Sequence, residues 1–519
     1  MTGRPVADPR SSTVDDVLRR SAARVPGRVA LRFADRSWTY ADLDDAVTRA
    51  AGVLLAAGLE PGDRVAAYGR NSDAYLIGYL GCARAGLVHV PVNYALTGEE
   101  LSYLLEQSGS RLVLVDPGLR GALDAVLGDV PAEQVLSLRD AEDSLLERSS
   151  TGPVPELDVD VTDLDLVQLL YTSGTTSRPK GAMMTHRALV HEYLSSVVAL
   201  QCAEGDDPLH CMPLYHSAGM HVFLMPYLAV GATNSLMEAP DVPEVLRRVE
   251  AERTGALFLA PTVWVPLANH PDLADRDLSS LRKAFYGASI MPVPVLQRLQ
   301  QRLPGLAFYN CFGQSEIGPL ATVLQPAEHD ARPDSCGRPV LFVEVRVVDE
   351  DGSDVGPDVS GELLYRSPQL CTGYWANPEA TEAAFQGGWF HSGDLVRRDA
   401  EGYLYVVDRI KDVINTGGVL VASREVEDAL YTHPGVAEVA VVATPDDRWI
   451  EAVTAVVVRR DSPEGAAVDE AELIAHARGT LAGFKLPKRV HFVAELPRNQ
   501  SGKLLKRVLR DELTASPSV

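Results

Sequence analysis

The sequence predicts an α/β protein, with a large N-terminal region of alternating strands and helices and a small α+β C-terminal domain. Three observations support this. The chain has 519 residues, which is too long for a single hydrophobic core. Short β-rich runs at 64–68 and 111–116 alternate with helical patterns at 46–57 and 74–85, as is typical of parallel sheets. A shorter, separate pattern of helices and strands begins after residue 408.

The ends of these regions can be placed from local signals. An N-cap at Thr13 precedes the first helical pattern, and residues 341–366 read as strand, Asp-Gly turn and strand, typical of an antiparallel insert. We therefore predict a loose tail over 1–12, an N-terminal domain over 13–408 and a C-terminal domain over 409–519. The C-terminal pattern predicts helices at 423–431 and 469–481 and strands at 436–443 and 452–458.

The composition is that of a soluble, acidic protein. Hydrophobic residues make up 46% and charged residues 23%, and the formal net charge is −23. Such a charge disfavours binding to nucleic acid or to anionic membranes. The apolar runs at 222–230 and 256–267 are shorter than the ~20 residues of a membrane span, and the N-terminus has no apolar signal segment. The six cysteines lack metal-type spacing. We expect a cytoplasmic protein with free thiols and without stable membrane insertion.

Lysine is rare in this chain. Of the 48 basic residues only seven are lysine, which suggests a GC-rich coding background. A lysine kept under that bias is expected where a compact ammonium cannot be replaced by a planar guanidinium. Lys180, Lys411, Lys503 and Lys506 all lie inside motif-like segments.

A Gly/Ser/Thr-rich loop with a lysine lies at 171–185 (YTSGTTSRPKGAMMT), between an apolar run and a helical pattern. Glycines let backbone N–H groups turn toward an anion, hydroxyls add donors, and Lys180 adds charge. This composition predicts a triphosphate clamp. A flexible linker is disfavoured by the flanking strand and helix. The spacing is not that of a Walker A loop, which disfavours a P-loop ATPase or kinase.

The loop resembles the phosphate loop of the adenylate-forming superfamily, which includes acyl-CoA synthetases, peptide-synthetase adenylation domains and luciferases. The pattern is closest to bacterial fatty-acyl-CoA synthetases. Further segments resemble that superfamily in order along the chain: PLYHSAGM (213–220), FYGAS (285–289), FGQSEIGP (312–319), GWFHSGDL (388–395), DRIKDVINTGG (408–418) and PRNQSGKLLKR (497–507). The resemblance implies two α/β sheets and a small β-barrel-like insert in the N-terminal region, with a mobile C-terminal domain.

The resemblance implies an ATP site with Mg²⁺ at Glu316. Ser315 replaces the usual threonine at the α-phosphate, and Phe312 replaces the commoner tyrosine beside adenine. Asp394 and Arg409 would contact the ribose. The remaining residues implied in nucleotide binding are Thr172, Ser173, Gly174, Thr175, Thr176 and Lys180 at the phosphates, and Gly287, Ala288, Ser289, Asn310, Cys311 and Gly313 near the adenine.

The resemblance also assigns catalytic roles. Lys503 would bridge the attacking carboxylate and the α-phosphate, Lys411 matches the hinge, and Gly418 would lie over the acyl-adenylate after rotation. Leu420 and Ser423 depart from the common pattern, which has a polar residue and a proline there. Adenylation is therefore better supported than thioester formation. A non-catalytic descendant is disfavoured because Lys503, Glu316 and Asp394 are all present.

His216 stands where amino-acid-activating relatives have an aspartate, so an α-amino acid is disfavoured. The acyl pocket is predicted from Tyr215, His216, His221, Val263, Gly287 and Gly313. We predict an ATP-dependent, AMP-forming acid–thiol ligase using ATP, Mg²⁺ and CoA. The alternative is a stand-alone adenylating enzyme that serves a carrier protein or partner enzyme. A fatty, an aryl or a specialised biosynthetic acid all stay open, as does a homodimer or a pathway partner.

Overall fold

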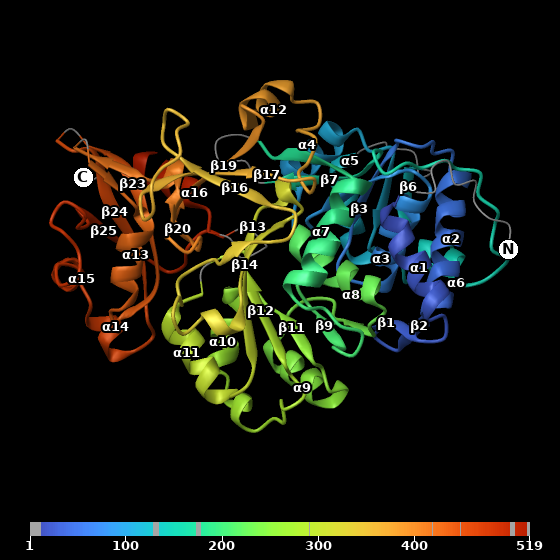
Figure 1. Ribbon diagram of the computed structural model, residues 1–519, viewed down its shortest axis with the longest axis horizontal. Helices are drawn as coiled ribbons and strands as arrows, with labels where there is room; N and C mark the ends of the chain where they lie inside the picture. The colour runs from blue at the N-terminus through green and yellow to red at the C-terminus, as the bar shows by residue number, and fades with distance from the viewer. Residues whose placement is uncertain are drawn as a thin grey trace. The chain divides into compact units, whose positions relative to one another are not determined.

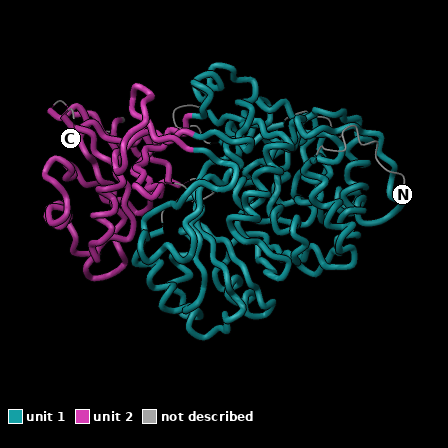
Figure 2. The backbone as a smooth tube through the Cα atoms, in the orientation of Figure 1, with its two compact units in different colours: residues 1–174, 178–344, 365–390 teal, residues 175–177, 345–364, 391–519 magenta. Residues whose placement is uncertain are grey.

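The computed structural model describes residues 12–127, 134–172, 178–289, 291–417, 419–446, 448–498 and 504–515. These residues divide into two compact units, coloured separately in Figure 2. Among the described residues, unit 1 contains 12–172, 178–344 and 365–390, and unit 2 contains 345–364 and 391–515.

The first sheet of unit 1 is mostly parallel. Its order within the described chain is β6-β5-β3-β4-β7-β8, and only β8 runs antiparallel to its neighbour. Helices α2 (Tyr40–Ala56) and α3 (Asp73–Arg84) cover one face, while α4 (Gly98–Ser108) and α5 (Arg120–Leu127) cover the other. The strands are β3 (Arg64–Tyr68), β4 (Val88–Val92), β5 (Leu112–Val115), β6 (Val135–Ser137), β7 (Leu166–Thr172) and β8 (Lys180–Thr185).

Strand residues alternate between the two helical layers of this sheet. Val65 and Ala67 of β3 lie in one buried cluster, and Ala66 and Tyr68 in the other. A sheet buried on both faces needs apolar residues at successive positions, and that is why its strands read as continuous apolar runs.

The second sheet of unit 1 has the order β15-β14-β13-β12-β11-β9-β10-β1-β2 within the described residues. Its central strands are parallel and its edges antiparallel. Helices α9 (Val242–Glu252), α10 (Pro261–Asn269) and α11 (Val293–Arg302) bury Val245, Trp264 and Leu299 against it (Figure 1). The strands are β1 (Val29–Phe33), β2 (Arg36–Thr39), β9 (Pro208–His210), β10 (Asn234–Leu236), β11 (Ala256–Phe258), β12 (Lys283–Gly287), β13 (Ala307–Gly313), β14 (Leu320–Leu324) and β15 (Arg338–Pro339).

Further helices of unit 1 pack on the apolar cluster of the first sheet. Leu18 of α1, Leu189 of α7 and Leu228 of α8 are buried there. Their bounds are α1 (Val14–Arg24), α6 (Leu145–Ser150), α7 (His186–Ala199), the π-helix η3 (Ala218–Leu224) and α8 (Met225–Val230), and α12 (Pro378–Ala384) follows later in the chain.

Two smaller sheets contain the strands from residue 344 onward that the structure describes. One has the order β16-β17-β19-β18, with β20 antiparallel to β19. The predicted insert over 341–366 supplies its first two strands. The bounds are β16 (Glu344–Val348), β17 (Ser360–Arg366), β18 (Phe385–Gln386), β19 (Trp389–Arg398) and β20 (Leu404–Arg409).

The C-terminal sheet has the order β22-β21-β24-β23, and β25 pairs parallel with β24. Its core contains Val426, Val441, Val453 and Leu473. The predicted helix at 423–431 is α13 (Ser423–Tyr431). The other elements are β21 (Ile414–Thr416), β22 (Val419–Val421), β23 (Val436–Asp446), β24 (Ile450–Arg459), α14 (Pro463–Ala467), α15 (Glu470–Ala477), β25 (Arg489–Val493) and α16 (Lys506–Ala515).

The predicted α/β class with two N-terminal sheets and a smaller C-terminal domain is confirmed. The predicted domain boundary after residue 408 stays a prediction, while compactness groups 391–408 with the C-terminal residues. In the part of the chain that is described, no helix is long and apolar enough to cross a bilayer.

Candidate active site

The predicted phosphate loop is carried by the hairpin of β7 and β8. Thr172 ends β7 and Lys180 begins β8, and the two residues are antiparallel partners in register. The hydroxyl and the ammonium therefore flank the base of the loop. Four of the predicted phosphate contacts, Ser173, Gly174, Thr175 and Thr176, lie outside the described residues.

Glu316 lies beside this hairpin base. It belongs to the short 3₁₀-helix η5 (Ser315–Ile317) that follows β13, and it is 6% exposed. Its Oε1 accepts hydrogen bonds from Thr172 Oγ1 at 3.0 Å and from the Tyr374 hydroxyl at 3.1 Å. Lys180 Nζ lies 5.3 Å from the centre of the Tyr374 ring. The structure thus brings together three predicted residues and one that the sequence did not indicate.

Tyr374 is placed by the edge of β8. Met183 N–H donates to the Gly373 carbonyl and Trp375 N–H to the Gly181 carbonyl. Burial, and then the nearby Glu316 carboxylate, raise the pKa of the Tyr374 phenol. The phenol therefore acts as a neutral hydrogen-bond donor to Glu316.

These donors and acceptors suit a magnesium ion. Mg²⁺ is commonly held by one or two carboxylates together with phosphate oxygens and water. Glu316 offers one carboxylate, which accepts hydrogen bonds from the hydroxyls of Thr172 and Tyr374. The described residues contain no cluster of three or more His, Cys, Asp or Glu that would form an all-protein cage. Glu316 would hold the ion, which would neutralise phosphate charge. Ser315 lies next to it, with its Oγ 2.9 Å from Ser217 Oγ.

The predicted adenine segments lie at the ends of β12 and β13. Gly287 pairs in register with Cys311, and a Cβ on Gly287 would come within 2.2 Å of the Cys311 carbonyl oxygen. A Cβ on Gly313 would come within 1.9 Å of the Pro319 carbonyl oxygen. Only glycine fits at either position.

Next to these glycines, Ala288 has a φ of +64° and is exposed, as is Ser289. Asn310 Nδ2 donates to the Ser335 carbonyl at 2.9 Å, and Phe312 is half-buried. Carboxyl ends of parallel strands are the usual place for a ligand in such sheets.

The predicted ribose pair lies within unit 2. Asp394 of β19 and Arg409 of β20 are antiparallel partners, and Arg409 Nε lies 2.6 Å from Asp394 Oδ1. Asp394 is 2% exposed. The carboxylate is therefore balanced by a guanidinium on the neighbouring strand.

Comparison with known proteins decides the family. The AMP-binding enzyme family model matches residues 18–375, and the model of the AMP-binding enzyme C-terminal domain matches residues 425–503. The chain belongs to the AMP-binding enzyme family. The segments that match include the hairpin, η5 and Tyr374.

Relatives within this family align with nearly the whole length of this chain. A feruloyl-CoA synthase from Amycolatopsis sp is 39% identical over 491 residues, 95% of this chain and 97% of the relative. An indoleacetate–CoA ligase from Aromatoleum aromaticum is 35% identical over 498 residues, 95% and 96% of the two chains. The crystal structure of ATP-bound MatB from Rhodopseudomonas palustris has a TM-score of 0.88 at 32% identity, covering 97% and 99%.

These relatives confirm the predicted membership of the adenylate-forming superfamily close to acyl-CoA synthetases. The predicted ATP-dependent, AMP-forming CoA ligase, with ATP, Mg²⁺ and CoA as its cofactors, agrees with the family and its relatives. The roles of single residues stay predictions.

The predicted acyl-pocket residues of this AMP-binding enzyme have different surroundings. Tyr215 and His216 are half-buried, and the Tyr215 ring lies edge-to-face with Tyr94 at 5.4 Å. Val263 of α10 is half-buried against the apolar cluster of the second sheet. Tyr94 and Tyr215 thus place aromatic surface next to His216 in the chain.

His221 lies in the core. It is 0% exposed, with Nδ1 3.0 Å from the Tyr193 hydroxyl and Nε2 2.7 Å from Gln168 Oε1. Gln168 Nε2 in turn lies 3.0 Å from His89 Nδ1. Burial lowers the pKa of both His89 and His221 to about 3, so both rings are neutral. His221 offers no exposed surface to an acyl chain.

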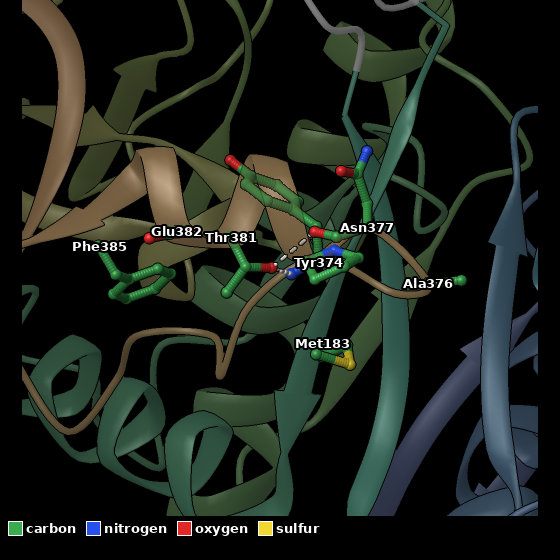
Figure 3. Close-up of a pocket in the computed structure, with 8 residues that line it drawn as sticks. Met183, Tyr374, Ala376, Asn377, Thr381, Glu382 and Phe385 are labelled. Carbon is green, nitrogen blue, oxygen red and sulfur yellow. Dashed lines mark hydrogen bonds between the residues drawn. The ribbon is translucent and has the colours of Figure 1, made fainter.

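A cavity of about 520 Å³ lies beside Tyr374 (Figure 3). The Thr381 hydroxyl in its wall accepts from Tyr374 N–H at 2.9 Å. The wall is formed by Met183, Tyr374, Ala376, Asn377, Pro378, Thr381, Glu382 and Phe385.

Near the predicted hinge, Lys411 is exposed in the 3₁₀-helix η7 (Ile410–Asp412). Gly418 and Lys503 lie outside the described residues. Lys506, one of the four lysines in motif-like segments, is largely buried: its Nζ lies 2.8 Å from Glu427 Oε1 and 2.6 Å from Ser423 Oγ. Ser423 Oγ also donates to Asp408 Oδ2 at 2.7 Å.

Proposed function

We propose that this chain activates an aromatic carboxylic acid as its acyl-AMP and transfers the acyl group to CoA. The carboxylate oxygen attacks the α-phosphorus of ATP and pyrophosphate leaves. The CoA sulfur then attacks the acyl carbonyl and AMP leaves. The observation that supports adenylation best is the buried Glu316 carboxylate, bound by Thr172 and Tyr374 at the base of the phosphate loop.

Charged residues have distinct roles in this reaction. Two anions must meet in the first step, so positioning and charge neutralisation should dominate. Lys180 supplies a fixed cation at the loop, and Glu316 holds the metal. Asp394 accepts hydrogen bonds from the ribose hydroxyls, and Arg409 contacts the ribose. Lys503 bridges the attacking carboxylate and the α-phosphate.

An aromatic acid is favoured by two facts together. Feruloyl-CoA synthase and indoleacetate–CoA ligase, by their names, act on aromatic acids, and both match nearly the whole chain. The half-buried Tyr215 and His216 add aromatic surface, with Tyr94 packed against Tyr215. No carboxylate stands at position 216 to pair with an α-ammonium.

The test is a panel assay of pyrophosphate release, run with and without CoA. Ferulate, indoleacetate and 3-phenylpropanoate should exceed palmitate in kcat/KM. Phenylalanine, the α-amino match of 3-phenylpropanoate, should be lower by about 100-fold, since its ammonium would be buried unpaired. AMP and acyl-CoA are the expected products.

The possible outcomes test adenylation, the class of acid and the acyl acceptor separately. ADP and phosphate as products would overturn adenylation. Palmitate exceeding every aromatic acid would overturn the acid class alone. Adenylate formed without acyl-CoA would favour a carrier protein as acceptor, as in the name of a fatty acid–[acyl-carrier-protein] ligase from Streptomyces coeruleorubidus, 33% identical.

A further inference from the structure

Two fully buried polar side chains lie behind the segment that carries Glu316. Glu192 comes from α7, and Gln369 from the loop between β17 and α12, and both are 0% exposed. Gln369 Nε2 donates to Glu192 Oε2 at 2.6 Å, although the two residues lie 177 positions apart. Burying such groups costs free energy unless they are hydrogen-bonded.

Their remaining bonds converge on one short segment, residues 316–320. Leu320 N–H donates to Glu192 Oε1 at 3.2 Å and Oε2 at 3.3 Å. Gln369 Nε2 donates to the carbonyls of Ile317 at 3.2 Å and Leu320 at 3.1 Å. Cys371, two residues further on, donates its N–H to the Glu316 carbonyl at 2.8 Å. The backbone from Glu316 to Leu320 is therefore fixed.

Helix α7 supports the pair from the other side. Ser195 Oγ donates to Gln369 Oε1 at 2.6 Å, and Ser196 Oγ to Glu192 Oε1 at 3.1 Å. Burial raises the pKa of the Glu192 carboxyl well above its ordinary value. Glu192 acts on Glu316 through the backbone that both residues share, because its oxygens accept from Leu320 N–H.

We infer that Glu192 and Gln369 are positioning residues of the adenylation reaction: they fix residues 316–320 and so place the Glu316 carboxylate against Thr172 and Tyr374. The inference rests on the proposed function, because it takes Glu316 as the group that holds the magnesium ion of Mg·ATP. Partners that orient a metal-binding carboxylate typically change metal affinity by about 10- to 100-fold.

The test measures ATP binding to the full chain by calorimetry, with Mg²⁺ and with EDTA. The ratio of the two Kd values reports the gain in affinity that the metal gives. Glu192→Leu and Gln369→Leu should each reduce this gain by about 10-fold, because the 316–320 backbone loses its support. Glu192→Gln keeps the shape and one acceptor oxygen for Leu320 N–H but places an amide donor against Gln369 Nε2, so it should keep more of the gain than Glu192→Leu.

Two matched controls lie on the same helix. Ser196→Ala removes a bond to Glu192 and leaves the bonds to residues 316–320 in place. Leu189→Ala removes buried apolar contacts of α7 and lowers the melting temperature without touching the polar pair. Both should keep the wild-type gain from Mg²⁺.

An unchanged gain in Glu192→Leu, or an equal loss of ATP affinity with and without Mg²⁺, would overturn the inference. If Glu192→Leu does not fold, Gln369→Leu decides by the same criterion, and Gln369→Met replaces it if that chain also fails. A wild-type chain without any gain from Mg²⁺ contradicts the proposed metal role of Glu316 itself, and is seen before any variant is compared.

Discussion

Glu316 in unit 1 and Asp394 in unit 2 are both buried carboxylates, but their partners differ. Glu316 accepts hydrogen bonds from the hydroxyls of Thr172 and Tyr374, whereas Asp394 pairs with the Arg409 guanidinium at 2.6 Å. Hydroxyl donors carry no positive charge, so the Glu316 carboxylate can attract a cation. The Asp394 charge is balanced by Arg409, which suits acceptance of hydrogen bonds from neutral hydroxyls.

One buried network of each unit shows a second contrast in charge. Unit 1 buries a neutral chain of His89, Gln168, His221 and Tyr193. Unit 2 buries Lys506 against Glu427, and this carboxylate and others nearby raise the pKa of Lys506 against the effect of its burial. These two networks should therefore respond differently to charge-changing substitutions and to pH.

The largest effect is expected at Lys503, which lies outside the described part of the chain and is predicted to supply the main catalytic charge. Lys503→Ala should slow adenylation by about 10²–10³-fold, the scale for losing one preorganised electrostatic donor. Thioester formation from supplied acyl-AMP should be nearly unchanged. Pyrophosphate exchange and acyl-CoA release measure the two steps.

The control for Lys503 is Lys485→Ala. Lys485 is a partly exposed cation paired with Glu425, and its loss should leave both steps unchanged. An equal loss of both half-reactions in Lys503→Ala would mean that the two-conformation mechanism does not apply.

The second effect tests the Glu316 side of the comparison. Glu316→Gln keeps an acceptor for Thr172 and Tyr374 but removes the charge, so kcat/KM for Mg·ATP should fall by about 100-fold. Pyrophosphate exchange at varied Mg²⁺ measures it. Thr172→Ser keeps the hydroxyl and serves as the control. Activity of Glu316→Gln at the wild-type level would assign the metal to other residues.

Local features of this site were accessible from sequence, while its long-range contacts were not. Thr172 and Lys180 lie eight positions apart in the segment predicted as a phosphate loop, and Ser423–Tyr431 is helical as its periodicity indicates. The expectation of a loop over 171–185 was wrong for residues 180–185, which form β8, because pairing with β7 cannot be read from a Gly/Ser/Thr-rich composition. Tyr374 reaches Glu316 across 58 positions, and no pattern along one chain reports such a pair.

Glu192 and Lys506 show the same limit. Glu192 lies among apolar residues on the buried face of α7, which reads as an ordinary helix position until Gln369 is placed beside it. The scarcity of lysine singled out Lys506, but helical periodicity cannot show that Glu427 and Ser423 cover it. Burial of a polar side chain depends on tertiary contacts.

The third effect is on stability and compares the two buried networks. His89 and His221 stay neutral in the folded chain, with a pKa of about 3, whereas the unfolded chain binds protons below about pH 6.5. Stability is therefore present above pH 6.5 and lost as the pH falls toward 3. Each histidine should lower the free energy of unfolding by about 2 kcal/mol when the pH is changed from 7 to 5.

Urea unfolding at the two pH values measures this effect. Four tryptophans, Trp38, Trp264, Trp375 and Trp389, lie in unit 1 and Trp449 lies in unit 2, so a Trp449→Phe background reports unit 1 alone. His221→Gln in that background should remove about 2 kcal/mol of the pH dependence. An unchanged pH dependence would show that His221 is not the titrating group.

The fourth effect tests the Asp394 side. Asp394→Asn should raise the KM for ATP by about tenfold, the scale of one hydrogen bond to a charged group, and leave kcat and the Mg²⁺ dependence unchanged. 2′-Deoxy-ATP and 3′-deoxy-ATP provide a double-mutant cycle. The wild type should bind one of these analogues more weakly than it binds ATP. Asp394→Asn should bind that analogue almost as well as it binds ATP. A full, additive loss in the variant would remove Asp394 from the ribose site.

The smallest effect concerns Ser423, whose N–H and hydroxyl both donate to Asp408 Oδ2, at 2.6 and 2.7 Å. Asp408 precedes the predicted hinge at Lys411 and Ser423 follows it, so these bonds span the hinge and must break when it rotates. Ser423→Ala should lower the stability of unit 2 by about 1 kcal/mol. The fluorescence difference between chains with and without the Trp449→Phe change during urea unfolding isolates the signal of unit 2 and measures that loss.

The same bonds should also hold back rotation. Ser423→Pro removes both donors and restores the residue common at this position, so steady-state acyl-CoA formation should rise by up to about fivefold, the rate equivalent of 1 kcal/mol. Adenylate formation without CoA should not change, because it needs no rotation. Ser149→Ala in unit 1, which removes a buried hydroxyl bound to the Leu145 carbonyl, is the control for a lost serine hydroxyl. If Ser423→Pro forms acyl-CoA more slowly while adenylation is intact, the prediction is contradicted. The bonds to Asp408 would then favour acyl transfer rather than slow it.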